Sequence, residues 1–232
     1  AGGISSGDFT IKNRSSDGTL GNYTFALYGG NSWKLGMGKL NLLLGGGYTR
    51  NDVETNRNVT LGASQKLSAS YHGSTWQLFG DLGYAIPWGE ANNVEPYVNI
   101  SWFDQRMNGF NESGGDAALG SSASTASLSS YTLGLRSALT FPNKAKALTI
   151  RTDLGWRHAG GDRSPTRSMS FIEGAGGVFS IAGAPIAKDS FLAGLSGEVT
   201  LGKYLVMGLS YHGEYGSGYA DNAGSLYMKM RF

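Results

Sequence analysis

The sequence contains no cysteine and only 5 prolines in 232 residues. The absence of cysteine excludes a disulfide framework and thiol chemistry. Few prolines, together with 37 glycines and 12 tyrosines, favour many strands and tight turns over helices. No apolar run approaches the ~18 residues of a membrane-spanning helix. Neither sign of charge is in large excess, because 19 Lys+Arg and 17 Asp+Glu give a net charge of +2. The net charge therefore does not indicate a nucleic-acid partner.

The clearest pattern that is present lies in the last part of the chain, residues 189–232. Alternate positions are apolar, as in Leu205, Met207 and Leu209, and the positions between them are small or polar, as in Gly208 and Ser210. Period two over three consecutive segments predicts antiparallel strands with one apolar and one charged face. A soluble sheet would bury the apolar face under a second layer. Strands of roughly 9–11 residues, apolar outward and polar inward, are instead typical of a transmembrane β-barrel.

The same alternation recurs upstream and predicts ten strands in an all-β, antiparallel up-and-down transmembrane β-barrel. The predicted strands lie near 8–15, 23–29, 40–48, 76–86, 98–102, 131–141, 148–156, 191–201, 205–215 and 226–232. Residues 51–72 are polar and predict either a long loop or two short strands, 59–63 and 67–71, which would raise the count to twelve. Nothing resembles a linker, so residues 1–232 are expected to form one domain.

The predicted connections alternate in length. Those at 31–38, 87–96, 142–146 and 202–203 are short. Those at 51–72, 107–127, 159–188 and, less clearly, 216–222 are longer, and 107–127 is rich in Gly, Ser and Ala, as in a mobile loop. Short periplasmic turns and long outer loops are the pattern of outer-membrane barrels.

Two sets of side chains are candidates for function. The charged face predicts either ion pairs that stiffen a hollow barrel or a polar conduit, and the two roles are compatible. Outward aromatic residues predict two belts at the bilayer interfaces, and the terminal Phe232, by similarity to outer-membrane proteins generally, an insertion signal. The predicted lumen residues are Asp81, Arg136, Arg151, Asp153, Arg157, Glu198, His212, Glu214, Lys229 and Arg231. The predicted belts have Trp76, Tyr131, Trp156, Phe191, Tyr211 and Tyr215 near the outer strand ends, and Trp88, Phe141 and Phe232 near the periplasmic ends.

Catalytic and metal sites have little support in the sequence. His158, Asp162 and Ser164 cluster at the outer end of a strand, where some outer-membrane hydrolases keep their residues, but no nucleophile motif accompanies them. His212 has no second ligand at metal-binding spacing, which favours a structural hydrogen bond. We therefore expect no catalysis in this chain and no cofactor.

Several stretches resemble one family in their order and spacing. They are VEPY at 94–97, FNE at 110–112, LGLR at 133–136, FSIAGAP at 179–185, GLSYHGEYGSG at 208–218 and LYMKMRF at 226–232. Together they resemble the C-terminal translocator domain of an autotransporter (type V secretion). The resemblance implies a twelve-stranded barrel, with a lumen-filling helix and a secreted passenger encoded before Ala1.

The expected function follows from this resemblance. The chain would insert in the bacterial outer membrane and enable export of an N-terminal passenger to the cell surface. Its expected partners are outer-membrane lipid, the barrel-assembly machinery and its own passenger, with no nucleic acid, and it would be a monomer. The alternatives are a general porin or channel, which needs no N-terminal extension, and a small outer-membrane hydrolase, which needs a catalytic cluster above the rim.

Overall fold

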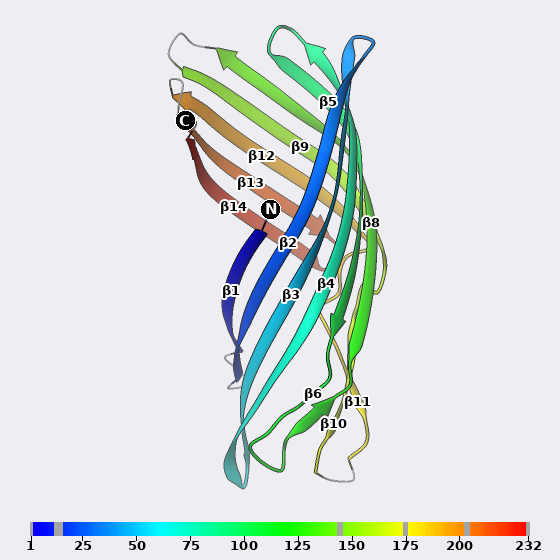
Figure 1. The fold of residues 1–232 in the computed structure, drawn as a ribbon, viewed down its shortest axis with the longest axis vertical. Helices are drawn as coiled ribbons and strands as arrows, with labels where there is room; N and C mark the ends of the chain where they lie inside the picture. Colours follow the sequence, from blue (N-terminus) through cyan, green and yellow to red (C-terminus); the bar gives the residue numbers. More distant parts are fainter. Residues whose placement is uncertain (1, 12–15, 143–145, 174–175, 202–204, 231–232) are drawn as a thin grey trace.

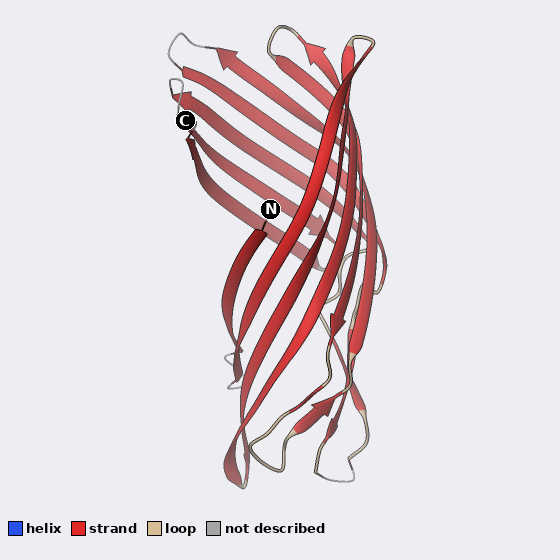
Figure 2. Cartoon of the chain, viewed as in Figure 1, coloured by secondary structure: helices blue, strands red, loops and turns tan. Residues whose placement is uncertain are grey.

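The computed structural model describes residues 2–11, 16–142, 146–173, 176–201 and 205–230, and their regular structure consists of strands (Figures 1 and 2). The described residues include no helix with the length and hydropathy to cross a membrane. Ten strands form one curled antiparallel sheet, in which successive strands lie side by side. They are β1 (Gly2–Ile11), β2 (Ser16–Leu35), β3 (Gly38–Leu61), β4 (Ala63–Trp88), β5 (Asn92–Met107), β8 (Ser124–Pro142), β9 (Lys146–Gly161), β12 (Asp189–Leu201), β13 (Leu205–Gly216) and β14 (Tyr219–Met230).

This sheet confirms the predicted all-β, up-and-down antiparallel architecture and its ten strands. β1 and β14 form the two edges, and no pairing joins them within the part of the chain that the structure describes. The connections agree with the predicted alternation only in part, because those after β3 and β13, predicted to be long, are tight turns of one and two residues. Short ones follow β2, β4, β8 and β12 at the upper end in Figure 1, whereas the long ones after β5 and β9 lie at the lower end.

Residues 51–72 are neither a loop nor a pair of short strands. β3 continues to Leu61, and β4 starts at Ala63 and pairs with β3 without a break. Gly62 alone forms the turn, with a φ of 72° that a side chain would disfavour. The prediction failed here because the hairpin extends past the lipid-facing part of the sheet. Its buried apolar side chains, such as Val53, Leu67 and Ala69, lie on the inner face, so the outward apolar alternation of the barrel wall is not continued.

The long connections 107–127 and 159–188 also contain regular structure. They supply β6 (Phe110–Asn111), β7 (Leu119–Ser121), β10 (Thr166–Phe171) and β11 (Phe179–Ala182), which form a second sheet in the order β11-β10-β7-β6. Backbone hydrogen bonds of 3.0 and 2.9 Å join Ser68 of β4 to Ser113. The fully buried Leu67 packs there against Ala117 and Ala118. The predicted mobile loop is therefore partly folded onto the β3–β4 hairpin.

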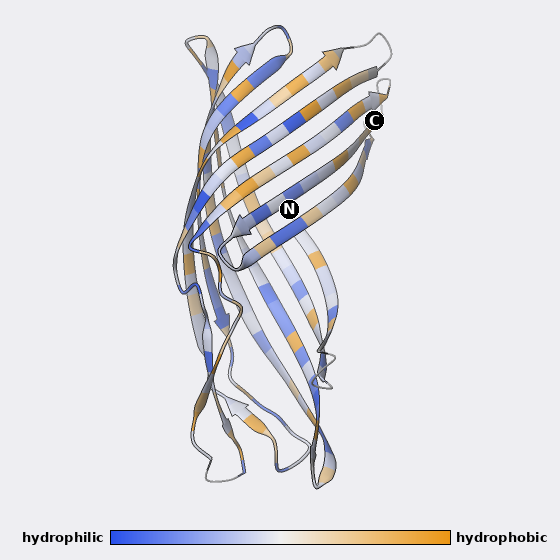
Figure 3. Cartoon of the chain, turned by 180° about the vertical axis from the view of Figure 1, so that it is seen from behind, coloured by the Kyte–Doolittle hydropathy of each residue, from blue (hydrophilic) through white to orange (hydrophobic). Residues whose placement is uncertain are grey.

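The ten-stranded sheet has one apolar and one polar face, visible as alternating colours along the strands in Figure 3. Cross-strand pairs keep the faces separate: Leu42 lies opposite Leu82, and Leu82 lies opposite Val98. The apolar face has large exposed side chains, including Leu27 at 73%. Exposing an apolar surface of this extent to water is unfavourable, and a lipid bilayer is the environment that fits it.

Candidate functional site: the polar face of the curled sheet

The register places the predicted lumen residues on one face. Opposed residues share a face: Arg136 lies opposite Asp153, Asp153 opposite Gly194, and Gly194 opposite His212. Arg231 lies outside the described residues. The members of the set on this polar face are Asp81, Arg136, Arg151, Asp153, Arg157, Glu198, His212, Glu214 and Lys229.

Arg136 is the centre of the larger charge cluster on this face. Its Nη1 donates to Asp81 Oδ1 at 3.0 Å and its Nη2 donates to the other oxygen, so the pair is bidentate. Glu95 Oε1 lies 3.8 Å from Nη1, and Asp153 Oδ2 lies 3.7 Å from Nε. The guanidinium carbon is 3.6 Å from the centre of the Tyr97 ring, whose hydroxyl donates to Asp153 at 2.7 Å. Three carboxylates and one aromatic ring thus hold a single cation.

The polar face is concave. Arg136 on β8 reaches Asp81 on β4 across β5, and Arg157 on β9 donates to Glu214 on β13 across β12. Neighbouring strands lie about 4.8 Å apart, so these partners start from backbones about 10 Å apart. Side chains that converge over two strand spacings require the sheet to curl toward them. The ion pairs therefore lie inside the curl, and the apolar face lies outside it.

A second cluster is centred on Glu198. Its Oε2 lies 3.5 Å from Arg151 Nη2, and its Oε1 lies 3.4 Å from Lys229 Nζ. The hydroxyl of Tyr227 also donates to Oε1, at 2.5 Å. With this cluster, every charged member of the described set has an ion-pair partner. Paired charges avoid the penalty of isolated ones in a confined space.

Glycines on the polar face leave room for the tyrosine rings. Gly134 lies opposite Tyr97, and a Cβ on Gly134 would overlap that ring. Gly208 lies opposite Tyr227 in the same way. These glycines therefore accommodate a neighbouring side chain of the wall itself, which lies flat and leaves the interior open.

A cavity of about 480 Å³ lies between the two clusters. Glu95, Arg136, Asp153, Ser196 and His212 are among its lining residues. His212 is exposed there, and within the described residues it has no side-chain hydrogen bond of the kind expected from the sequence. No group of three or more His, Cys, Asp or Glu side chains in the described ranges is arranged to hold a metal ion.

His158 and Asp162, two of the residues considered for a hydrolase site, form hydrogen bonds with different partners and not with each other. His158 Nδ1 lies 2.8 Å from Asp189 Oδ1, and its ring packs 5.1 Å from the ring of Tyr131 on the apolar face. Asp162 accepts a hydrogen bond from the backbone N–H of Ser127 at 2.9 Å. Asp162 thus binds a backbone N–H, and Asp189 is the acid that orients His158. The structure therefore does not form a His158–Asp162–Ser164 site.

The aromatic residues of the predicted outer belt share the apolar face. Trp156 lies opposite Phe191, and Phe191 lies opposite Tyr215. Five residues of the predicted outer belt lie in the half of their strand that is nearer the end of the sheet with the long connections: Tyr131, Trp156, Phe191, Tyr211 and Tyr215. At the other end, Trp88 is the last residue of β4, and Phe141 is next to the last residue of β8. Phe232 lies outside the described residues.

Trp76 corrects one detail of this prediction. It lies in the middle of β4 and not near its outer end, because β4 starts thirteen positions earlier, at Ala63. Past Trp76, the same face carries Ser74 and His72, so the apolar band ends at Trp76 all the same. Tyr48, whose ring is 4.9 Å from that of Trp76, continues the row. Tyr48 and Trp102 could have been assigned to the row from sequence, because both end an apolar alternation.

Single-tryptophan variants should test the two belts. Depth-dependent quenching is expected to place Trp76 and Trp156 at one interface and Trp88 at the other, because amphipathic rings prefer the headgroup region. Trp33, near the short turn after β2, serves as an independent control and should group with Trp88. Grouping of Trp88 with Trp76 would contradict the proposed topology.

Comparisons with known proteins agree with the architecture. A curled up-and-down sheet with an apolar outer face and an ion-paired inner face defines a membrane-embedded β-barrel protein of the outer-membrane type. Residues 1–212 match the family described as Autotransporter beta-domain. The chain belongs to this autotransporter family.

Two curated relatives and one solved structure show the extent of the similarity. The chain is 32% identical over 219 residues to an extracellular serine protease of Serratia marcescens, covering 94% of this chain and 20% of that protein. A second extracellular serine protease of the same organism is 31% identical over 197 residues, covering 84% and 19%. The chain thus spans about a fifth of the length of these relatives. The translocator domain of the autotransporter NalP from Neisseria meningitidis has the same fold, with a TM-score of 0.59, 16% identity, and coverage of 100% of this chain and 81% of that chain.

Family membership establishes the coarse function. The chain is an autotransporter translocator domain, it resides in the bacterial outer membrane, and it associates with the membrane and with a passenger. It is a transport unit and not a catalytic one. The general-porin and hydrolase alternatives are therefore set aside.

Proposed function

We propose that the passenger crosses the outer membrane through the interior of the curled sheet, and that the polar face described above lines its path. The observation that carries this proposal is that each charged residue of the predicted set on the concave face, from Asp81 on β4 to Lys229 on β14, contacts an opposite charge. A wet interior needs polar walls, and an unfolded chain of arbitrary sequence needs walls without strong isolated charges. These contacts join four cations to five carboxylates, which leaves a polar wall with little net charge and so supplies both conditions.

The second sheet would form the exit of this path. Phe110 stacks on Tyr71 of the polar face with ring centres 4.6 Å apart, and the Arg167 guanidinium carbon lies 4.8 Å from the Phe110 ring centre. The same face of the second sheet carries Phe179 and Ile181, which are exposed. Exposed apolar side chains at the mouth of a polar channel suit an emerging chain that has not yet buried its own apolar residues.

The remaining partners follow from the surface. We propose a monomer, because the apolar outer face is the area that lipid covers. We also propose that the barrel-assembly machinery inserts it and reads Phe232, which in the sequence continues the alternation of Leu226, Met228 and Met230. The passenger would be exposed outside the cell, consistent with the name of the two Serratia relatives, extracellular serine protease.

Two neighbouring substitutions on β12 test the path. Ser196 lies on the polar face and lines the cavity, whereas Gly197 lies on the apolar face with open space around a Cβ. With an epitope-tagged passenger fused before Ala1, Ser196→Trp should reduce surface exposure of the epitope several-fold. Gly197→Trp should leave surface exposure unchanged, because its ring enters lipid. The readout is protease accessibility on intact cells, normalised to folded barrel.

The outcomes separate two routes. Loss of export with Ser196→Trp alone supports passage through the interior. Equal export from both variants, with both barrels folded, would mean that the passenger moves beside the barrel.

A further inference from the structure

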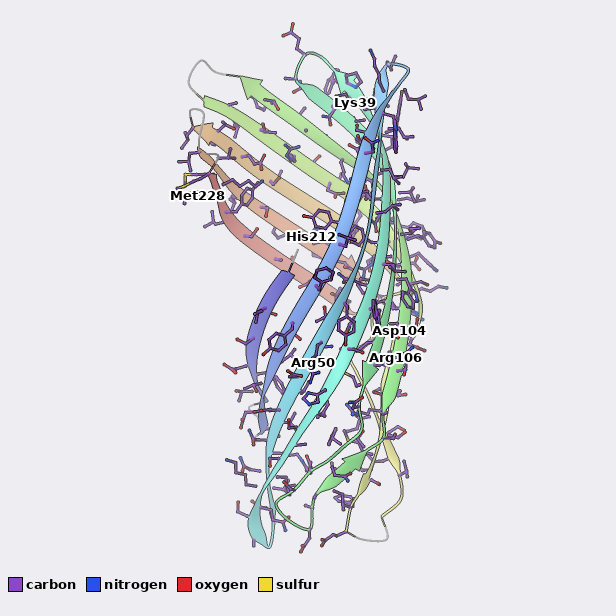
Figure 4. All side chains as sticks on the ribbon, in the orientation of Figure 1. Lys39, Arg50, Asp104, Arg106, His212 and Met228 are labelled. Atoms are coloured by element: carbon purple, nitrogen blue, oxygen red, sulfur yellow. The ribbon has the colours of Figure 1, made fainter. Side chains whose placement is uncertain are left out.

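A row of polar residues crosses the outer, apolar face immediately beyond the aromatic row. In register, Arg50 of β3 lies opposite Ser74 of β4, and Ser74 lies opposite Arg106 of β5. Two positions closer to the short turns, the same strands carry Tyr48, Trp76 and Asp104. Two residues of a strand span about 6.6 Å, so the arginines lie one headgroup layer beyond the aromatic rings. Figure 4 shows Arg50 and Arg106 at a similar height on the barrel.

The guanidinium groups of Arg50 and Arg106 are each held in place by an aspartate, and their terminal N–H donors remain available to a ligand. Arg50 Nε lies 3.1 Å from Asp52 Oδ1, and Arg106 Nε lies 3.0 Å from Asp104 Oδ1. The terminal nitrogens of both have no partner within the described residues, and the side chains are 53% and 69% exposed. The two Asp residues therefore fix the inner edge of each guanidinium and leave the outer fork free. A planar fork of this kind matches the geometry of a phosphate group.

The spacing indicates two phosphates and not one. Arg50 and Arg106 are separated by one strand, β4, so that their backbones lie about 10 Å apart. The small Ser74 between them leaves a shallow gap rather than a bulky side chain. The two arginines lie on the convex outer face, where side chains from flanking strands diverge, so a ligand that contacts both forks needs two anionic groups at this distance or more.

The patch around Arg50 and Arg106 has no net charge, which favours recognition of a ligand by the geometry of its anionic groups. The two arginines are balanced by Asp52 and Asp104, and His72 hydrogen-bonds to Asp52 at 2.7 Å. The Arg50 hydrogen bond lowers the pKa of the Asp52 carboxyl, which stays ionised at neutral pH. A patch without excess positive charge gives little long-range attraction for anionic lipid in general. Selectivity must then come from the two forks.

We propose that Arg50 and Arg106 form a binding site for a glycolipid headgroup that carries two phosphates, in the outer monolayer of the membrane. Each guanidinium fork contacts one phosphate, and the sugar backbone lies over Ser74. The acyl chains then descend along Tyr48 and Trp76 and the leucines beneath them. Such a lipid fixes the depth of the barrel at the side where the β3–β4 hairpin leaves the membrane. This site is independent of the route that the passenger takes.

Lipid retention tests the site. The folded barrel is reconstituted in phosphatidylcholine nanodiscs with a minor fraction of diphosphoryl lipid A, monophosphoryl lipid A or phosphatidylglycerol, then extracted in mild detergent. Retained lipid is quantified by mass spectrometry, and folding is checked by heat modifiability. The wild-type protein should retain diphosphoryl lipid A in preference to the other two. Arg50→Gln with Arg106→Gln should reduce that retention at least tenfold, because the loss of each charged hydrogen-bonding group corresponds to about a factor of ten or more.

Two further variants make the result specific. Arg50→Lys with Arg106→Lys keeps the charge but loses the forks, and should lose most of the preference for two phosphates over one. Lys66→Gln removes a cation from the same face of β4, farther from the aromatic row, and should leave retention unchanged. Equal retention of diphosphoryl and monophosphoryl lipid by the wild type would overturn the proposal. So would undiminished retention by the folded double-Gln variant.

Discussion

Leu135→Arg should destabilise the folded barrel by roughly 2–4 kcal/mol, the cost of an arginine at the bilayer midplane. Leu135 lies on the apolar face of β8, about midway between Phe141 near the short turn and Tyr131 in the outer aromatic row. Its neighbours directly across the strands are Pro96 and Leu154, and the adjacent hydroxyls of Ser137 and Thr152 are uncharged and hydrogen-bonded to each other, so no carboxylate on that face pairs with the guanidinium. The measurement is reversible urea unfolding of the barrel in lipid vesicles, followed by tryptophan fluorescence.

Ser129→Arg is the matched control for this prediction. Ser129 lies on the same strand and the same face, two residues beyond Tyr131. An arginine there can reach the headgroups, and the expected cost is about 0–1 kcal/mol. If Leu135→Arg proved as mild as Ser129→Arg, the assignment of faces would be off by one residue, since a one-residue slip moves every side chain to the other face.

Arg136→Leu should cost about 2–3 kcal/mol, although it adds apolar area inside the barrel. The substitution removes the only cation in contact with Asp81, Glu95 and Asp153 among the described residues. Breaking a buried ion pair by removing one partner typically costs 3–5 kcal/mol. The Arg136 side chain is 33% exposed, so that water screens part of the effect and the expected cost is smaller.

A double-mutant cycle isolates this interaction. In the Asp81→Asn background, the cost of Arg136→Leu should fall, because the bidentate partner is already gone. Arg151→Leu is the control on the same face. Its side chain is 55% exposed with one contact at 3.5 Å, so the expected cost is below about 1 kcal/mol. Similar costs for Arg136→Leu and Arg151→Leu would show that the cluster around Arg136 contributes no special stability.

The sequence predicted the parts of the sheet that a bilayer constrains. Between the two aromatic rows, lipid on one side and a wet interior on the other impose period two, which is readable at Leu40 to Tyr48 and at Leu133 to Phe141. Past the outer row, the outer face of β3 and β4 is polar, whereas the inner face carries buried residues such as Val53 and Leu67. Residues 51–61 continue the same ladder, but their few apolar side chains lie on the inner face, so the outward apolar alternation stops and the hairpin was missed for that reason.

The sequence predicted which residues belong to the candidate site, but not which of them form ion pairs with one another. Alternation indicates that Asp81, Arg136 and Asp153 share a face. Which acid meets which base depends on the curl of the sheet, since Arg136 reaches across β5 to Asp81 while β9 brings Asp153 from the other side. Curvature depends on every strand together and has no local signature. The second sheet was missed because its strands are short and pair only with one another.

The strand order of the sheet also determines how the barrel can be assembled. Each strand of the large sheet is bonded to the one that precedes it in the sheet order, and most are joined by a tight turn. Closing such short loops costs little entropy, so the sheet can grow by adding one hairpin after another. The edges β1 and β14 belong to opposite ends of the chain, and any step that covers them must act over nearly its whole length. Slow steps in folding are therefore expected at these edges, and substitutions within the interior hairpins should alter stability more than the rate of assembly.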